Sequence, residues 1–407
     1  MALLAIFTVA IVATACTIAL RLLRIPGGAP AAALCAGLLA GVFLGPAVLG
    51  RVAPDLHESL SLGSASQAES LKELQSRQAA DIAALVAIDA SPIAIAETQA
   101  EHAEDIAPLR ESLDQARAQR RILFMTAAFG AALLWILFTA IASPVALAAR
   151  RDDARIALAM ACAAIVVTIA LTFPLTLWLL GATRSQALAF AAACAVTMWV
   201  YDYRALASDT LRRASAPTGW IVGGALAMTA LAVAIDSFEA VEIALALIVL
   251  ALWIRTRRPV IRRSRRRRRL RWRAAWTIFA PSLVAICAAQ LDFATLIGTA
   301  DFWIATLIAI ALGHDGRWLG SLLGLRIAGA PDDLKDRWQR SGVLLDHGAG
   351  VMQCAGALII LMHRAAPPAL IGALLVTAAM IELFQPIRQP IARWMDRGRE
   401  AGEDESV

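Results

Sequence analysis

Ionisable side chains interrupt several long apolar segments of this sequence, and Asp236 is the best placed of them to do chemistry. It ends the apolar segment 218–236, and Ser237 and Glu239 follow it. A carboxylate in an apolar environment is costly to ionise, so partial burial makes it easier to protonate. It can then bind either a proton or a monovalent cation, and the two compete. Asp236, Glu239 and Glu242 also suit a solvated turn between two helices, and the sequence leaves both interpretations open.

Four other residues could support such a site. Thr197 offers a hydroxyl and, at a broken helix, freed backbone carbonyls that suit a desolvated Na⁺ or K⁺. A threonine in a helix also bonds its own backbone, so a structural role stays open. Asp202 is expected to pair with nearby arginines. His347 could respond to pH, or it could form an interfacial pair with Asp346. Arg317 would stay charged, and it could hold a neighbouring helix or anchor the surface.

The composition indicates an all-α polytopic membrane protein. The chain has 407 residues, of which 59% are apolar and 17% charged. A soluble domain is nearer 45–50% apolar and about 25% charged. Apolar runs of roughly 18–25 residues are long enough to cross a bilayer as helices. We expect about eleven such helices, near 3–23, 29–49, 122–148, 155–181, 185–204, 218–236, 239–254, 275–291, 302–325, 342–362 and 368–386.

The sequence gives no indication of an enzyme. The six cysteines all lie inside apolar runs without a CxxC spacing, so neither a zinc site nor a disulfide framework is predicted. No phosphate-binding loop, nucleophile elbow or metalloprotease motif occurs. We therefore expect no cofactor, no transition metal and no bound nucleic acid.

The arginines predict the orientation in the membrane. Every arginine cluster follows an odd-numbered expected helix, and positive charge favours the cytoplasmic side. This places the N-terminus outside and the C-terminus in the cytoplasm of a bacterial-type inner (plasma) membrane. The Arg255–Arg273 segment then forms a cytoplasmic loop that lies against anionic lipid.

Residues 52–120 are too polar to lie in the membrane. Their apolar residues recur at helical spacing, and Asp89-Ala-Ser-Pro92 is a chain-reversing signal. This pattern predicts an antiparallel helical hairpin outside the cytoplasm, coiled-coil-like over a few heptads, which could bind a protein partner. A loosely ordered polar loop is the alternative.

Six regions follow from these patterns. They are the first two membrane helices (1–51), the hairpin (52–120), membrane helices three to seven (121–254), the Arg-rich cytoplasmic loop (255–273), membrane helices eight to eleven (274–390) and a cytoplasmic tail (391–407).

The second expected helix carries the most specific motif of the chain. An Arg24-Ile-Pro-Gly-Gly turn precedes Ala36-Gly-Leu-Leu-Ala-Gly-Val-Phe-Leu-Gly-Pro-Ala-Val-Leu-Gly50. This motif resembles the N-terminal signature of the cation:proton antiporter superfamily, and of its Kef-type branch in particular. Weaker similarities follow in the family's order at Ala193–Met198, Ala232–Ala240, Gln290–Leu296, Gly316–Ser321 and Gly348–Gly350.

The resemblance implies two inverted repeats around two broken, crossing helices. It also implies exchange of protons for Na⁺ or K⁺ by alternating access, and a homodimer. In the family, a lysine at the position of Arg317 pairs with the ion-binding acid.

The chain departs from the family at the key acid. Relatives usually have a polar companion beside the essential aspartate, whereas Asp236 is flanked by Ile235 and Ser237. Either Asp236 is the essential acid without its companion, or Ser237 replaces it. The inserted hairpin is a second departure, so the alternative function is a transport-inactive scaffold or receptor that works through this hairpin.

Overall fold

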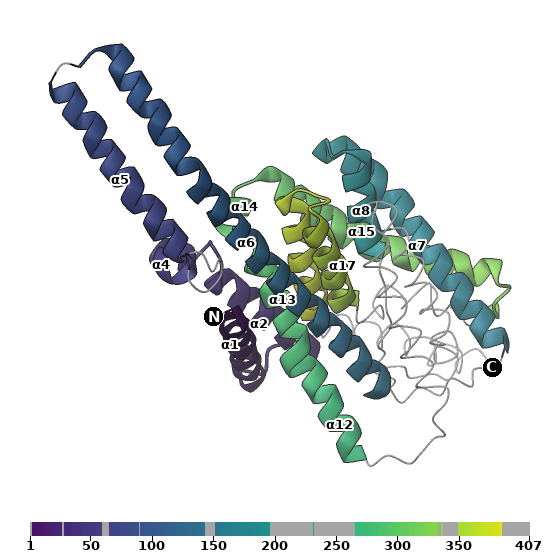
Figure 1. The fold of residues 1–407 in the computed structure, drawn as a ribbon. Helices are drawn as coiled ribbons and strands as arrows, with labels where there is room; N and C mark the ends of the chain where they lie inside the picture. Colours follow the sequence, from purple (N-terminus) through teal and green to yellow (C-terminus); the bar gives the residue numbers. More distant parts are fainter. Residues whose placement is uncertain are drawn as a thin grey trace, which may run out of the picture.

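The structure is a computed structural model, and every element that it describes is a helix, which confirms the all-α prediction for that part of the chain (Figure 1). The described residues are 2–26, 28–58, 65–88, 90–142, 151–195, 231, 265–332, 335–336 and 349–384. The helices are α1 (Ala2–Leu22), α2 (Gly28–Leu44), α3 (Leu49–Val52), α4 (Pro54–His57), α5 (Ala65–Ala87), α6 (Pro92–Ala142), α7 (Arg151–Leu180), α8 (Arg184–Ala195), α12 (Arg265–Ala274), the π-helix η2 (Ala275–Phe279), α13 (Ala280–Ala288), α14 (Phe293–Leu296), α15 (Ala300–Ile327), α17 (Ala349–His363) and the helix Pro368–Phe384.

Within the described residues, three spans are long and apolar enough to cross a bilayer. They are Leu3–Leu22, Gly28–Val52 and Leu158–Leu180. Two shorter apolar helices, Gly350–His363 and Pro368–Phe384, come late in the chain. The expected helices at 218–236 and 239–254 lie outside the described residues, except for Leu231, which is helical and buried. The count of eleven therefore stays a prediction.

Helices α7 and α15 are antiparallel and touch backbone to backbone. Gly316, Gly320 and Gly324 recur every fourth residue and so form one face of α15. A Cβ on Gly324 would lie 2.5 Å from the carbonyl oxygen of Ala159, and one on Gly320 would overlap the backbone of Ala163. Small residues at this spacing allow apolar helices to approach closely.

Helices α2 and α13 also pack closely through glycines, although these two helices run parallel. Gly37 and Gly41 of α2 lie against α13, and a Cβ on either would come within 2.6 Å of a backbone oxygen, that of Pro281 or Ala285 respectively. These glycines belong to the motif that the sequence singles out. Their function here is to seat the second helix on a helix from the second half of the chain.

The Arg-rich segment is helical in its second part, which differs from the expected loop over 255–273. Arginine is a good helix former, and α12 continues through η2 into α13. The π turn at η2 has a local cause at Pro281, whose ring would clash with the carbonyl of Thr277, four residues earlier, in a regular α-helix. In the π register, Pro281 has no N–H to donate to the carbonyl of Trp276, five residues earlier. Arg21 of α1 supplies the missing donor, with Nη2 at 3.1 Å from that oxygen, and its Nη1 donates to Thr277 Oγ1 at 2.6 Å.

Helices α5 and α6 form an antiparallel pair that projects from the bundle (Figure 1). The chain reverses between Ala87 and Pro92, at the signal seen in the sequence. The expected boundary at residue 120 falls inside α6, which is continuous over 51 residues, or about 77 Å at 1.5 Å per residue. No glycine or proline interrupts α6 between Pro108 and Gly130, so the hairpin arm and the third expected membrane helix are one helix.

The base of the hairpin is fixed to the bundle by α4. Glu58 accepts a 2.7 Å hydrogen bond from Nη2 of Arg117 on α6. His57 is buried beside Gly50, and its Nε2 has no hydrogen-bond partner within the described structure. Burial lowers the pKa of His57 below its ordinary value of 6.5, and the nearby Glu58 opposes this only in part. His57 is therefore held neutral.

Replacing Gly320 with alanine should separate α7 from α15, because the new methyl group meets the backbone of Ala163 and Ala164. We expect a loss of about 1–3 kcal/mol, the usual cost of overpacking, seen as a lower thermal midpoint in detergent. The matched control is Gly130→Ala in α6, where a Cβ meets nothing within 4 Å. Equal midpoints for the two variants would contradict the close packing.

Stability should fall at acidic pH because of His57. Its pKa is lower in the folded state than the ordinary 6.5, so the folded state binds the proton less readily than the unfolded state. The stabilisation is complete above pH 6.5 and is lost as the pH falls below it. Thermal midpoints measured across this range should be less pH-dependent in His57→Gln. The control is His363→Gln, at an exposed histidine, which should keep the wild-type pH dependence.

Candidate functional site

The last described residues of α8 lie between α15 and α17. The side chains from Ala189 to Ala195 are all buried. A Cβ on Gly356 of α17 would lie 3.0 Å from that of Ala193, and one on Gly313 of α15 would lie 3.4 Å from that of Cys194. Glycines on both neighbours therefore admit the α8 backbone between them.

Arg317 brings a positive charge into this packing. Its side chain is only 3% exposed, and Nη1 donates a hydrogen bond of 3.2 Å to the carbonyl oxygen of Cys194. A backbone carbonyl oxygen carries partial negative charge, so a charged donor is stabilising there. Since a guanidinium stays protonated, this charge is fixed. Arg317 thus links α15 to the part of α8 that directly precedes Thr197 in the sequence.

Two further buried polar side chains come from the last two helices. Gln353 of α17 is 1% exposed, and its Oε1 has no hydrogen-bond partner within the described structure. Glu382 of the Pro368–Phe384 helix is also 1% exposed. A Cβ added to Gly350 of α17 would lie 3.2 Å from the Cγ of Glu382, so the two helices are in close contact there. Its carboxylate interacts electrostatically with the thiols of Cys35 on α2 and Cys354 on α17. A buried acid therefore lies where α2, α17 and the last helix meet.

Sequence reasoning missed Glu382. The signal was present, because this acid follows Ala378-Ala-Met-Ile381 within a segment expected to cross the membrane. Ionisable residues in such segments are expensive and are commonly functional. The motif similarities directed attention to Asp236 instead, and they include no acid in the last helix.

The structure places one of the seven predicted site residues, Arg317. The other six lie outside the described residues: Asp236, Thr197, Ser237, Glu239, Asp202 and His347. Their roles therefore stay predictions. The described contact of Arg317 is with the helix leading to Thr197, which belongs to the first of the two expected broken helices.

Asp292, in the weaker family similarity at Gln290–Leu296, is half-buried. It accepts a 2.6 Å hydrogen bond from Thr295 Oγ1 at the start of α14, and Arg51 lies 3.4 Å from the same carboxylate oxygen. The Thr295 hydrogen bond and, less strongly, the Arg51 charge lower the pKa of Asp292. This pattern is typical of a helix cap. Within the described residues, no three His, Cys, Asp or Glu side chains gather as a metal site requires.

No protein-family model matches the chain, and no curated protein is significantly similar to it. Function is therefore inferred from the residues and contacts of the chain itself.

Replacing Arg317 with methionine should destabilise the bundle, because the buried carbonyl of Cys194 loses a charged donor. A hydrogen bond to a charged group contributes about 1.5–3 kcal/mol, so the thermal midpoint in detergent should fall clearly. Arg317→Lys keeps the charge and should recover part of the loss. The control is Arg326→Met, at an exposed arginine of the same helix. Equal midpoints for the two methionine variants would show that Arg317 does not hold α8.

Proposed function

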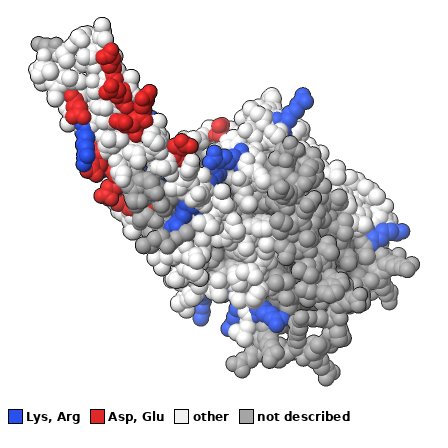
Figure 2. Space-filling model, viewed as in Figure 1, with Lys and Arg blue, Asp and Glu red and all other residues white. Residues whose placement is uncertain are grey.

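We propose that the chain is a polytopic membrane protein with the architecture of the cation:proton antiporters, two inverted repeats around broken, crossing helices. Three apolar spans and the glycine-mediated contacts support the location in a membrane. The charge distribution supports the orientation. Helix α12 and the α5–α6 hairpin lie toward opposite ends of the described structure in Figure 1, and Figure 2 shows acidic side chains gathered on the hairpin. The hairpin then lies outside the cytoplasm and the C-terminus inside.

The proposed activity is exchange of protons for Na⁺ or K⁺ by alternating access. Asp236 is the proposed ion-binding carboxylate, with Thr197 contributing oxygen ligands. A proton and a cation cannot occupy one carboxylate together, so release of one accompanies binding of the other. Each cycle then carries the two ions in opposite directions. A homodimer is expected from the family resemblance.

The observation that best supports this proposal is the buried contact between Arg317 and Cys194. A fixed positive charge beside the helix that leads to Thr197 favours the ionised form of a nearby carboxylate. It also disfavours permanent occupation of the site by a cation, since like charges repel. Both effects suit a site that must bind and release its ion in every cycle.

Glu382 is a second candidate acid. It is buried between α2, α17 and the last helix, and ionisable residues at such positions in membrane proteins are commonly functional. A carboxyl group in this position can pick up or release a proton when the helices around it rearrange. We propose that it supports the exchange rather than binding the transported cation, since its described neighbours include two thiols.

The alternative function is a transport-inactive scaffold or receptor. The hairpin favours it, because the described parts of α5 and α6 carry exposed acidic residues in both arms. Such a surface suits a basic partner protein outside the cytoplasm. This alternative predicts that no cation is exchanged.

Exchange should be measured with purified protein in proteoliposomes that contain a pH-sensitive dye, with Na⁺ or K⁺ added outside. We expect cation-driven proton movement in the wild type and none in Asp236→Asn, because an amide cannot alternate between a proton and a cation. Glu382→Gln should slow the exchange without abolishing it. Asp301→Asn, at an exposed acid of α15, is the matched control.

Two outcomes would contradict the proposal. Undiminished exchange in Asp236→Asn would exclude Asp236 as the ion-binding acid. Absence of exchange in the wild type with either cation would favour the scaffold function.

A further inference from the structure

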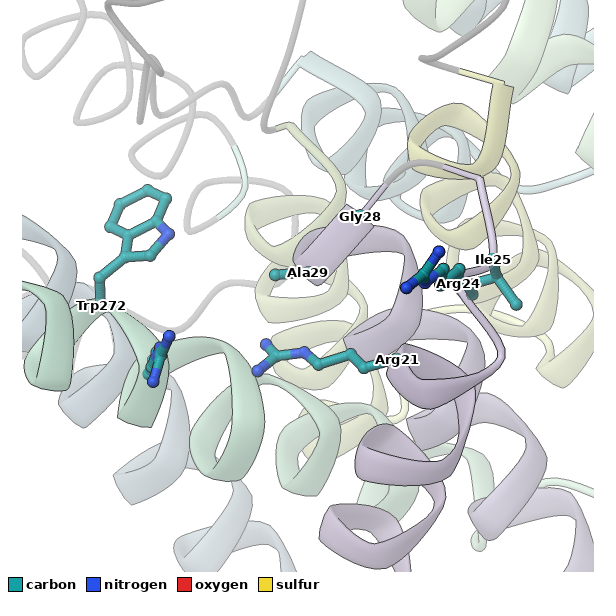
Figure 3. A pocket seen from close by; sticks show the side chains of 7 residues that line it. Arg21, Arg24, Ile25, Gly28, Ala29 and Trp272 are labelled. Carbon is teal, nitrogen blue, oxygen red and sulfur yellow. The ribbon is translucent and has the colours of Figure 1, made fainter.

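A cavity of about 320 Å³ opens where the end of α1, the start of α2 and the last turn of α12 meet (Figure 3). Its lining comprises Arg21, Arg24, Ile25, Gly28, Ala29, Trp272 and Arg273. The α1–α2 turn and α12 are far apart in the sequence. The tertiary structure alone brings their basic residues together.

Three arginines face this cavity. Arg21 comes from α1, Arg24 from the turn after it and Arg273 from α12. Within the described structure, none of the three forms an ion pair with a carboxylate. Three like charges around one cavity repel each other, and a bound anion would remove this repulsion.

Arg21 and the other two arginines have different roles. Figure 3 shows Arg21 extended from α1 toward the helix formed by α12 and η2, and its terminal nitrogens donate to Trp276 and Thr277 of η2. Arg21 therefore builds the wall of the cavity. Arg24 and Arg273 are exposed and have no such hydrogen bonds in the described structure, so they are available to a ligand.

The backbone around the cavity favours the same kind of ligand. Arg24 has a φ of 53°, in the left-handed region that residues other than glycine seldom adopt, so the tight turn sets its position. Gly28 and Ala29 form the first turn of α2, whose N–H groups point out of the helix end and carry partial positive charge. These groups add to the attraction that the arginines exert on an anion.

The position of the cavity identifies the source of the anion. It lies at the ends of Leu3–Leu22 and Gly28–Val52, two of the spans that could cross a bilayer. Trp272 lines it, and tryptophan is enriched at the membrane–water interface. An anion held at this level is a lipid headgroup.

We propose that this cavity binds the phosphate diester of an anionic glycerophospholipid, with Arg24 and Arg273 as its direct ligands. The acyl chains would lie along the exposed apolar surface of α1, which includes Leu22 and Leu23. This site rests on the membrane location proposed above but not on transport. It is a defined binding site rather than the general attraction of an Arg-rich segment to the membrane.

The test uses the full-length protein in detergent, titrated with short-chain phosphatidylglycerol, short-chain phosphatidylcholine or inorganic phosphate. We expect phosphatidylglycerol to bind the wild type more tightly than the other two. Arg24→Gln with Arg273→Gln should weaken its binding about 25-fold, at roughly fivefold for each charge removed. The matched control, Arg271→Gln with Arg326→Gln, removes two charges outside the cavity lining and should change binding less than about threefold.

Three results would overturn the proposal. Equal losses in the two double variants would show diffuse attraction instead of a site. Equal affinity for phosphatidylcholine would exclude recognition of the anionic headgroup, and equally tight binding of inorganic phosphate would make free phosphate the ligand.

A measurement on the wild type covers the case in which the cavity variant does not fold. Photoactivatable phosphatidylglycerol should label peptides that contain 21–29 and 265–273, and labelling confined to other peptides would overturn the site. Extraction of the chain from membranes by salt alone would contradict the membrane location itself. A failed lipid titration of detergent-extracted protein would contradict only this site.

Discussion

The close approach of helix backbones is the constraint on which the described structure depends. Glycines at every fourth residue let α15 lie directly on α7, and a second set seats α2 on α13. Apolar helices in a lipid environment gain little from burial alone, so their association depends on tight packing. Single glycines on α15 and α17 then admit the end of α8 between them. The position of the candidate site follows from these contacts.

A second constraint acts on the backbone carbonyls, which need hydrogen-bond donors wherever water is excluded. Arginines meet this need twice. Arg21 donates to the carbonyl of Trp276, for which Pro281 offers no N–H, and Arg317 donates to the carbonyl of Cys194. In both cases a charged side chain links two helices that are distant in the sequence. Each of these hydrogen bonds offsets part of the cost of burying the charge.

The charged residues are distributed unevenly along the molecule. The basic cavity between α1, α2 and α12 lies at one end, the acidic hairpin lies at the other, and the buried Arg317 and Glu382 lie in the packed helices. An ion exchanger needs a desolvated charge between two differently charged faces, and a receptor needs an exposed surface on one of them. A buried acid and a buried arginine are compatible with the proposed exchanger, and the exposed acidic residues of the hairpin are compatible with the alternative scaffold.

The sequence by itself determined the helical class, the three apolar spans and the chain reversal before Pro92. These features depend on local composition and periodicity, which are visible in any short window. It also singled out the glycines of the second expected helix, and Arg317 as a candidate site residue. It missed Glu382, because a single acid in an apolar run carries no information about which helices surround it. It placed a boundary at residue 120, where the composition changes from polar to apolar, but such a change does not interrupt a helix that has no glycine or proline near it.

Only the tertiary structure decided which helices touch. The contact of Arg317 with Cys194 joins residues 123 positions apart, and Arg21 meets Thr277 across 256 positions. Such pairings depend on how whole helices pack, and no local pattern encodes them. The convergence of Arg24 and Arg273 on one cavity is of the same kind. The sequence shows that both are basic, and the fold makes them neighbours.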